Sequence, residues 1–179
     1  MKNENGFSLI ETIVALGILA TGLLGMAALF TLGLTNMATS SANLVAREKA
    51  REAVESVHTA RDTRTIVWCQ IFNKDAPTRP PGCSNAASDN GVFLTEPQPM
   101  YKAGVDGLVG TADDATSGYE TASDGSKLTN YTRQIIIETL KDEDGSVMPN
   151  LRKIVVKIDY HVGQIYRTYT LTTYISSIS

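Results

Sequence analysis

The sequence predicts an α+β protein in which a long N-terminal helix packs on a C-terminal antiparallel sheet of about three to four strands. Three observations support this fold class. Residues 7–34 are almost entirely apolar, residues 36–64 contain neither proline nor glycine, and residues 131–178 alternate between apolar and polar side chains. The first two patterns are typical of one continuous helix, and the third is typical of half-buried strands.

Length and charge narrow the functional classes. The 179 residues carry 16 Lys and Arg against 19 Asp and Glu, a formal net charge of −3. We expect one domain, with or without an appendage. The slightly acidic balance argues against an electrostatic nucleic-acid binder, which would need a basic patch. The charge is also unevenly distributed, because the 35 residues from Thr12 through Ala46 carry none.

The segment 7–34 predicts a membrane-spanning helix whose one charge is Glu11. Its 28 residues would make a helix about 42 Å long, enough to cross a bilayer with some tilt. A secretory signal peptide would have an apolar region of about 7–15 residues, so this run is too long for one. A carboxylate in such a helix is either functional or reaches the headgroups from the start of the helix.

The residues Gly6-Phe7-Ser8-Leu9-Ile10-Glu11 and the apolar run after them resemble the cleavage and methylation signature of type IV prepilins and type II secretion pseudopilins. The resemblance implies that a prepilin peptidase cleaves after Gly6 and that Phe7 is N-methylated. It also implies that Glu11 neutralises the terminal amine of a neighbouring subunit during assembly. Pairing would offset the cost of two charges buried in a filament core.

The element Gly22-Leu23-Leu24-Gly25 resembles minor pilins of the V, or pilus-modification, type. Ala28 stands where many major pilins have a proline. The resemblance implies a pilin-like fold and a precursor in the inner membrane with its head outside the cytoplasm. It also implies a final location in a pilus, at the cell surface or in the periplasm. The implied partners are other minor and major pilins through the N-terminal helix, prepilin peptidase, the assembly platform and the membrane.

We expect five segments along the chain. They are a cleaved leader (1–6), a transmembrane or filament-core half of the helix (7–34), a head-packing half (35–65), an irregular region (66–130) and the antiparallel sheet (131–179). An apolar stripe along the second half of the helix should face the sheet; it comprises Ala46, Ala50, Val54 and Val57. The irregular region holds five of the six prolines, and we expect one short strand in it, at 92–95.

Cys69 and Cys83 are the only cysteines. Outside the cytoplasm they would be oxidised. A disulfide between them would close a loop of about 15 residues and contribute about 3 kcal/mol in the chain-entropy model. Two free thiols are the alternative. Pilins more often close a C-terminal loop in this way, so the position departs from the family's pattern. We expect Trp68 to pack against the disulfide.

A glycine-bent loop carries Asp106, Asp113 and Asp114. Three carboxylates with backbone carbonyls nearby suit a hard cation such as Ca²⁺. The loop resembles the calcium loop of major pseudopilins, although it precedes the C-terminal strands instead of following the first ones. A solvated acidic turn is the alternative. No other metal or cofactor is expected.

The sequence shows no nucleophile elbow, phosphate-binding loop or zinc-protease motif, so we expect no enzyme. The expected function is that of a minor type IV pilin, a structural subunit that initiates or modifies pilus assembly after peptidase processing. One alternative is a type II secretion pseudopilin. Another is a single-pass membrane-anchored protein whose residues 66–130 recognise a ligand.

Overall fold

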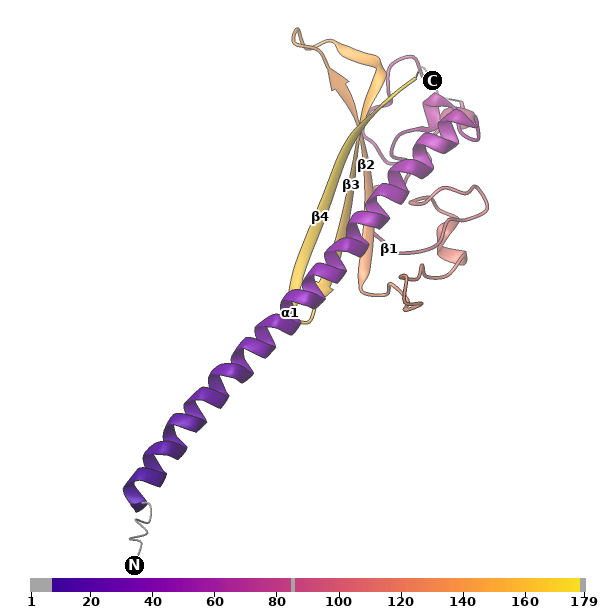
Figure 1. Ribbon diagram of the computed structural model, residues 1–179. Helices are drawn as coiled ribbons and strands as arrows, with labels where there is room; N and C mark the ends of the chain where they lie inside the picture. Colours follow the sequence, from indigo (N-terminus) through magenta and orange to yellow (C-terminus); the bar gives the residue numbers. More distant parts are fainter. Residues whose placement is uncertain (1–7, 85, 178–179) are drawn as a thin grey trace, which may run out of the picture. The chain divides into compact units, whose positions relative to one another are not determined.

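The computed structural model describes residues 8–84 and 86–177 (Figure 1). The chain divides into two compact units between Ser41 and Ala42. We call residues 8–41 the N-terminal unit and residues 42–177 the head. The helix α1 (Leu9–Asp62) runs through both units with 54 residues. The predicted continuity of the helix is therefore confirmed over the described residues.

In the N-terminal unit, α1 is apolar on every side. Residues 8–38 are all exposed, and the helix is long and apolar enough to cross a membrane. Its threonines donate their hydroxyls to carbonyls three or four residues earlier, as Thr21 does to Ile18 and Thr31 to Ala27. Because these polar groups are satisfied within the helix, they add little to the cost of a lipid environment.

The head contains one four-stranded antiparallel sheet. Its strands follow the order β1 (Gln98–Pro99), β2 (Tyr131–Lys141), β3 (Val147–Val162) and β4 (Ile165–Ser176). In the register Tyr131 lies opposite Tyr160, and Val162 opposite Ile165 across a two-residue turn. The three long strands lie where the alternation of residues predicted them. The architecture is α+β and pilin-like, as expected.

The head-packing part of α1 covers one face of the sheet, as Figure 1 shows. The buried residues of the helix are Ala46, Ala50, Ala53, Val57 and Ala60. They belong to one core with the inward-facing residues of the long strands, among them Ile135, Ile154, Val156, Ile158 and Ile175. Val54, which we expected in the stripe, is only partly buried, because Ala53 occupies the inward position of that turn. Alanines let the helix axis approach the sheet closely.

The irregular region is held by side-chain hydrogen bonds more than by strand ladders. The expected strand at 92–95 is wrong: Phe93 forms an isolated bridge with Asn73, and the short strand β1 lies at 98–99. Asn73 is buried and binds three backbone groups, accepting from Ile137 N at 2.7 Å and donating to the carbonyls of Ile135 and Leu94. One amide side chain thus ties this region to β2.

Candidate functional site

The start of α1 holds the predicted assembly residue. Glu11 lies in the first helical turn, and its side chain is exposed. Its backbone N–H donates to Ser8 O at 3.0 Å, so the residue is already fixed in helical geometry. A carboxylate here also lies near the positive end of the helix dipole. Gly6 and Phe7, the predicted processing residues, lie outside the described residues.

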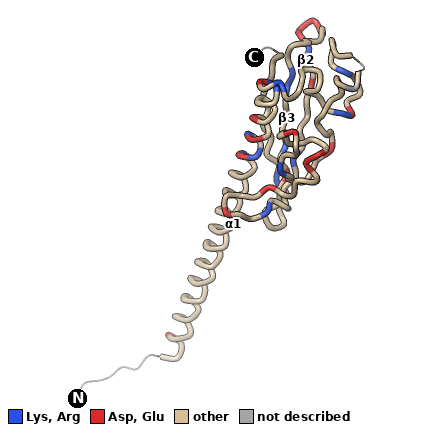
Figure 2. Tube along the Cα trace, turned by 90° about the vertical axis from the view of Figure 1, so that its right-hand side faces the viewer, with Lys and Arg blue, Asp and Glu red and all other residues tan. Residues whose placement is uncertain are grey.

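The rest of the N-terminal unit presents an uninterrupted apolar surface. Figure 2 shows this part of the helix almost entirely without Lys, Arg, Asp or Glu. Large side chains that are more than half exposed occur along its whole length, for example Leu9, Ile18, Leu24, Phe30 and Met37. Apolar surface this extensive indicates a lipid or protein environment. Glu11 is the one ionisable side chain within it.

A disulfide joins Cys69 and Cys83, with 5.4 Å between their Cα atoms. Cys69 lies in the short 3₁₀ helix η1 (Trp68–Gln70), seven residues beyond the end of α1, and both cysteines are half-buried. The indole Nε1 of Trp68 donates to Pro149 O at 2.9 Å on β3. The disulfide loop is therefore attached both to the end of α1 and to the sheet.

Sequence reasoning missed Arg152, which lies beneath this loop. It is 1% exposed, and its guanidinium lies over the Trp68 ring, 4.1 Å from the centroid. It donates to the carbonyls of Trp68 and Ile71, and its Nη2 lies 3.9 Å from Cys83 Sγ. Burial lowers the pKa of Arg152 to about 10, so the group remains charged at neutral pH. The alternation of buried and more exposed residues along β3 could have revealed it, because this alternation places the even-numbered residues, including Arg152, on the inward face.

The three predicted metal ligands do lie together. One ligand atom of each carboxylate, from Asp106, Asp113 and Asp114, lies within 4.8 Å of the others. Asp114 is buried and accepts hydrogen bonds from the backbone N–H groups of Gly104 and Gly110 at 3.0 and 2.6 Å. Such bonds fix the loop whether or not a cation is present.

The electrostatics of Asp113 and Asp114 differ. Burial raises the pKa of Asp114, although the backbone N–H groups oppose this shift. The hydroxyl of Thr111 donates to Asp113 Oδ1 at 2.7 Å and holds the pKa of that carboxyl below its usual range. Gly104 lies so close to Asp113 that a Cβ on it would be 2.2 Å from Oδ2. Both carboxylates and the glycine are therefore parts of one tight turn.

A buried ion-pair network links α1 to the irregular region, and sequence reasoning missed it as well. Glu120 accepts from Arg133 Nη1 at 2.8 Å, and its other oxygen lies 2.8 Å from Lys49 Nζ. Arg133 also donates to Tyr101 O at 3.0 Å. Burial alone would lower the pKa of Lys49, but its interactions with the carboxylates of Glu120 and Glu52 outweigh this effect, and the pKa is raised.

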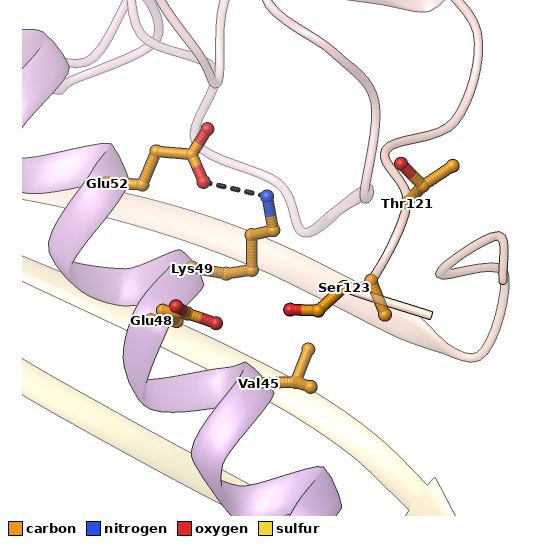
Figure 3. A pocket seen from close by; sticks show the side chains of 7 residues that line it. Val45, Glu48, Lys49, Glu52, Thr121 and Ser123 are labelled. Atoms are coloured by element: carbon orange, nitrogen blue, oxygen red, sulfur yellow. Dashed lines mark hydrogen bonds and ion pairs between the residues drawn. The ribbon is translucent and has the colours of Figure 1, made fainter. Parts of the chain in front are cut away.

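A shallow cavity opens beside Lys49, with a volume of about 280 Å³ (Figure 3). Figure 3 shows Lys49 turned toward Glu52, at 2.7 Å, with Glu48, Thr121 and Ser123 along the rim. The ammonium group pairs with the carboxylates of both Glu52 and Glu120. We therefore interpret the cavity as the outer edge of the structural network.

Comparison with known proteins adds one finding. Residues 1–27 match the family model described as the prokaryotic N-terminal methylation motif, which is the class III signal of the type IV pilin and pseudopilin family. The predicted resemblance of residues 6–11 is thereby confirmed for the signal itself. No curated protein and no solved structure matches the chain.

Proposed function

We propose that the chain is a minor type IV pilin, a structural subunit that initiates or modifies pilus assembly. The observation that carries the proposal is the methylation motif at residues 1–27, which continues into an exposed and uncharged helix. The pilin-like α+β fold, in which the second half of α1 packs on the antiparallel sheet, supports it. A structural role agrees with the generally non-enzymatic character of the family.

The proposed mechanism is the assembly of processed subunits into a filament. Residues 7–34 hold the precursor in the inner membrane, with the head outside the cytoplasm. Prepilin peptidase removes residues 1–6 and exposes the amine of Phe7, which is then methylated. The apolar helix next moves from lipid into the filament core, where its exposed side chains find protein partners. Glu11 pairs there with the amine of a neighbouring subunit, since either charge alone would be costly in a dry core.

The segments of the chain divide this work. Residues 7–34 serve in the membrane and then in the filament core, and residues 35–65 join the helix to the head. Residues 131–179 form the sheet, which supports the irregular region 66–130 and its disulfide. In this proposal residues 66–130 contribute the surface that distinguishes this subunit from the other subunits of a filament.

A type II secretion pseudopilin is the second candidate. The specific observation in its favour is the cluster of Asp106, Asp113 and Asp114, which resembles the calcium loop of major pseudopilins. Both candidates share processing, methylation and the role of Glu11. They differ in whether the filament reaches the cell surface.

Localisation in the native host separates the candidates. The full chain, tagged at its C-terminus, is followed in sheared surface fibres, in the periplasm and in the membrane. A minor pilin is expected in the sheared fibres, in processed form and at a small fraction of the major subunit. Processed protein absent from the fibres but associated with the secretion apparatus would favour the pseudopilin. Unprocessed protein confined to the membrane would contradict both.

A further inference from the structure

The environment of the Cys69–Cys83 disulfide contains a buried cation without a carboxylate partner. None of the ion pairs formed among the described residues includes Arg152. Its guanidinium contacts only neutral groups among the described residues, namely two backbone carbonyls, the Trp68 ring and the Cys83 sulfur. Its Nε has no hydrogen-bond partner. A buried cation that lacks a counter-ion favours any anion that forms next to it.

The atom positioned to become that anion is Cys83 Sγ. Asp89, six residues beyond Cys83, is already engaged, because its carboxylate accepts from both the N–H and the hydroxyl of Ser84. Arg79 is directed elsewhere, donating to Ser84 O and Asn90 Oδ1. Among the described residues, Cys69 Sγ forms no hydrogen bond with either arginine. The two sulfurs of the disulfide are therefore electrostatically unequal.

From this asymmetry we propose that Cys69–Cys83 is an exchangeable disulfide, with Cys69 the sulfur attacked by an external dithiol and Cys83 the leaving thiolate stabilised by Arg152. A disulfide breaks fastest toward the thiol of lower pKa, and a neighbouring arginine lowers a thiol pKa. Both cysteines are half-buried, so a reductant can approach the bond. The site is independent of the proposed pilin function and requires only that a dithiol reach the head.

The reaction balances in two steps. A thiolate of the dithiol attacks Cys69 Sγ, the S–S bond breaks, and its electron pair goes to Cys83 Sγ beside the guanidinium. The second thiol of the dithiol then attacks the mixed disulfide, loses its proton to solvent and releases Cys69 as a thiolate. The dithiol is oxidised to its disulfide while the cysteine pair gains two electrons. The reverse sequence reforms the bond.

The same geometry gives the exchange a structural consequence. The carbonyls that hold Arg152 belong to Trp68 and Ile71, on either side of Cys69. In the reduced head the Cys83 thiolate competes with these carbonyls for the guanidinium. Redox state would thereby alter how the loop 69–83 is held against β3. The disulfide is thus a switch for the loop as well as a link.

The first test measures thiol pKa values in the full chain, held in detergent micelles and reduced with dithiothreitol that is then removed. The rate of iodoacetamide alkylation is followed against pH, and each cysteine peptide is quantified by mass spectrometry. Cys83 is expected to titrate at least one unit below Cys69, and this difference is expected to vanish in urea. A Cys83 pKa equal to or above that of Cys69 in the folded chain would overturn the proposal without any variant.

The second test identifies the attacked sulfur and the effect of the cation. Glutathione is expected to form its trapped mixed disulfide on Cys69; a mixed disulfide mainly on Cys83 would contradict the assignment. Arg152→Gln is expected to favour the oxidised pair about tenfold in glutathione buffers, equivalent to about 30 mV. Arg152→Lys should retain part of the effect.

Arg167→Gln is the matched control for the charge change. Arg167 is exposed on β4 and lies opposite Tyr160, eight residues along β3 from Arg152. This variant should leave the redox equilibrium and the Cys83 pKa unchanged. An equal shift in Arg152→Gln and Arg167→Gln would show that net charge, not the local contact, sets the equilibrium, and would overturn the role of Arg152.

Discussion

Glu120 is the residue that holds the ion-pair network of Lys49 and Arg133 together. It pairs with Arg133 and Lys49, whose side chains are 2% and 16% exposed. Replacing Glu120 by Gln removes the anion and leaves the buried Arg133 cation without its carboxylate hydrogen-bond partner. We expect the free energy of unfolding to fall by about 3–5 kcal/mol, as for other broken buried pairs. Denaturant unfolding of the full chain in micelles measures this.

Glu138→Gln is the control for that variant. Glu138 pairs with Lys153 at 2.9 Å, but its side chain is 51% exposed. Solvent screens an exposed pair, so this substitution should change stability little. Similar losses for the two variants would show that burial of the Glu120 network contributes nothing specific.

Glu11 carries the assembly prediction at the residue scale. Glu11→Gln keeps the size of the side chain and removes its charge, so membrane insertion and cleavage should persist. Incorporation into filaments should fall tenfold or more, because the amine of a neighbouring subunit would lose its partner. Quantitative blotting of sheared fibres measures incorporation. Glu55→Gln, on the exposed face of α1 in the head, should incorporate normally; equal incorporation of both variants would remove Glu11 from the mechanism.

Single residues were predictable where a periodic element or a motif placed them. Glu11 was predicted from the signal motif, whereas Arg152 was missed, although extending the alternation of β3 by two residues would have placed it on the inward face. Glu120 was not predictable, because it lies in the irregular region, where no repeat indicates which side chains point inward. Its partners Lys49 and Arg133 lie on two different elements, and only the folded chain brings them together.

At the scale of elements, the disulfide loop should contribute measurable stability. Replacing both cysteines by serine releases a loop of about 15 residues in the unfolded chain. We expect a loss of about 3 kcal/mol in the free energy of unfolding, and faster proteolysis at residues 70–90. Equal unfolding midpoints for the oxidised protein and the double variant would show that the bond is energetically idle.

The acidic loop 104–114 carries the calcium prediction. A cation that binds only the folded state stabilises it by about 2.7 kcal/mol at a hundredfold excess over Kd. The full chain should therefore melt higher in millimolar Ca²⁺ than in chelator at matched ionic strength, and Mg²⁺ should help less. The increment should shrink as the pH falls toward the raised pKa of Asp114, because a protonated carboxyl no longer attracts the cation.

Asp106→Asn is the sharpest variant for this prediction. Asp106 Oδ1 accepts from Leu108 N at 2.8 Å, and an asparagine oxygen preserves that turn while removing the charge. The variant should lose the calcium increment and melt like the wild type in chelator. Asp124→Asn is the matched control, because Asp124 makes the same kind of turn with Ser126 N at 2.9 Å. A calcium increment that survives Asp106→Asn would reduce the loop to a solvated acidic turn.

Whole elements could be predicted where a regular pattern of apolar and polar residues continues over many positions. The continuous helix and the three long strands have such patterns, and they lie where we expected them. The strand β1 has only two residues, one of them a proline, and offers no pattern. The path of the irregular region depends on Asn73, whose three backbone hydrogen bonds reach across more than 20 residues. No local sequence pattern predicts such long-range hydrogen bonds.

At the scale of the whole molecule, the chain combines two units with different solvent requirements. The N-terminal unit exposes apolar side chains throughout residues 8–38, whereas the head encloses a core of its own. A helix of the first kind is stable only in lipid or among other apolar helices. The methylation motif at residues 1–27 is the class III signal of the type IV pilin and pseudopilin family, and in the proposed assembly its processing precedes transfer of the helix from membrane to filament.

The most direct test of this account is mass spectrometry of the N-terminal peptide of the protein isolated from filaments of its native host. The account predicts a chain that lacks residues 1–6 and begins with N-methylated Phe7. The processed mass should disappear when the host's prepilin peptidase is deleted. An intact Met1 in assembled filaments would contradict the central claim that the chain is a pilin-like subunit.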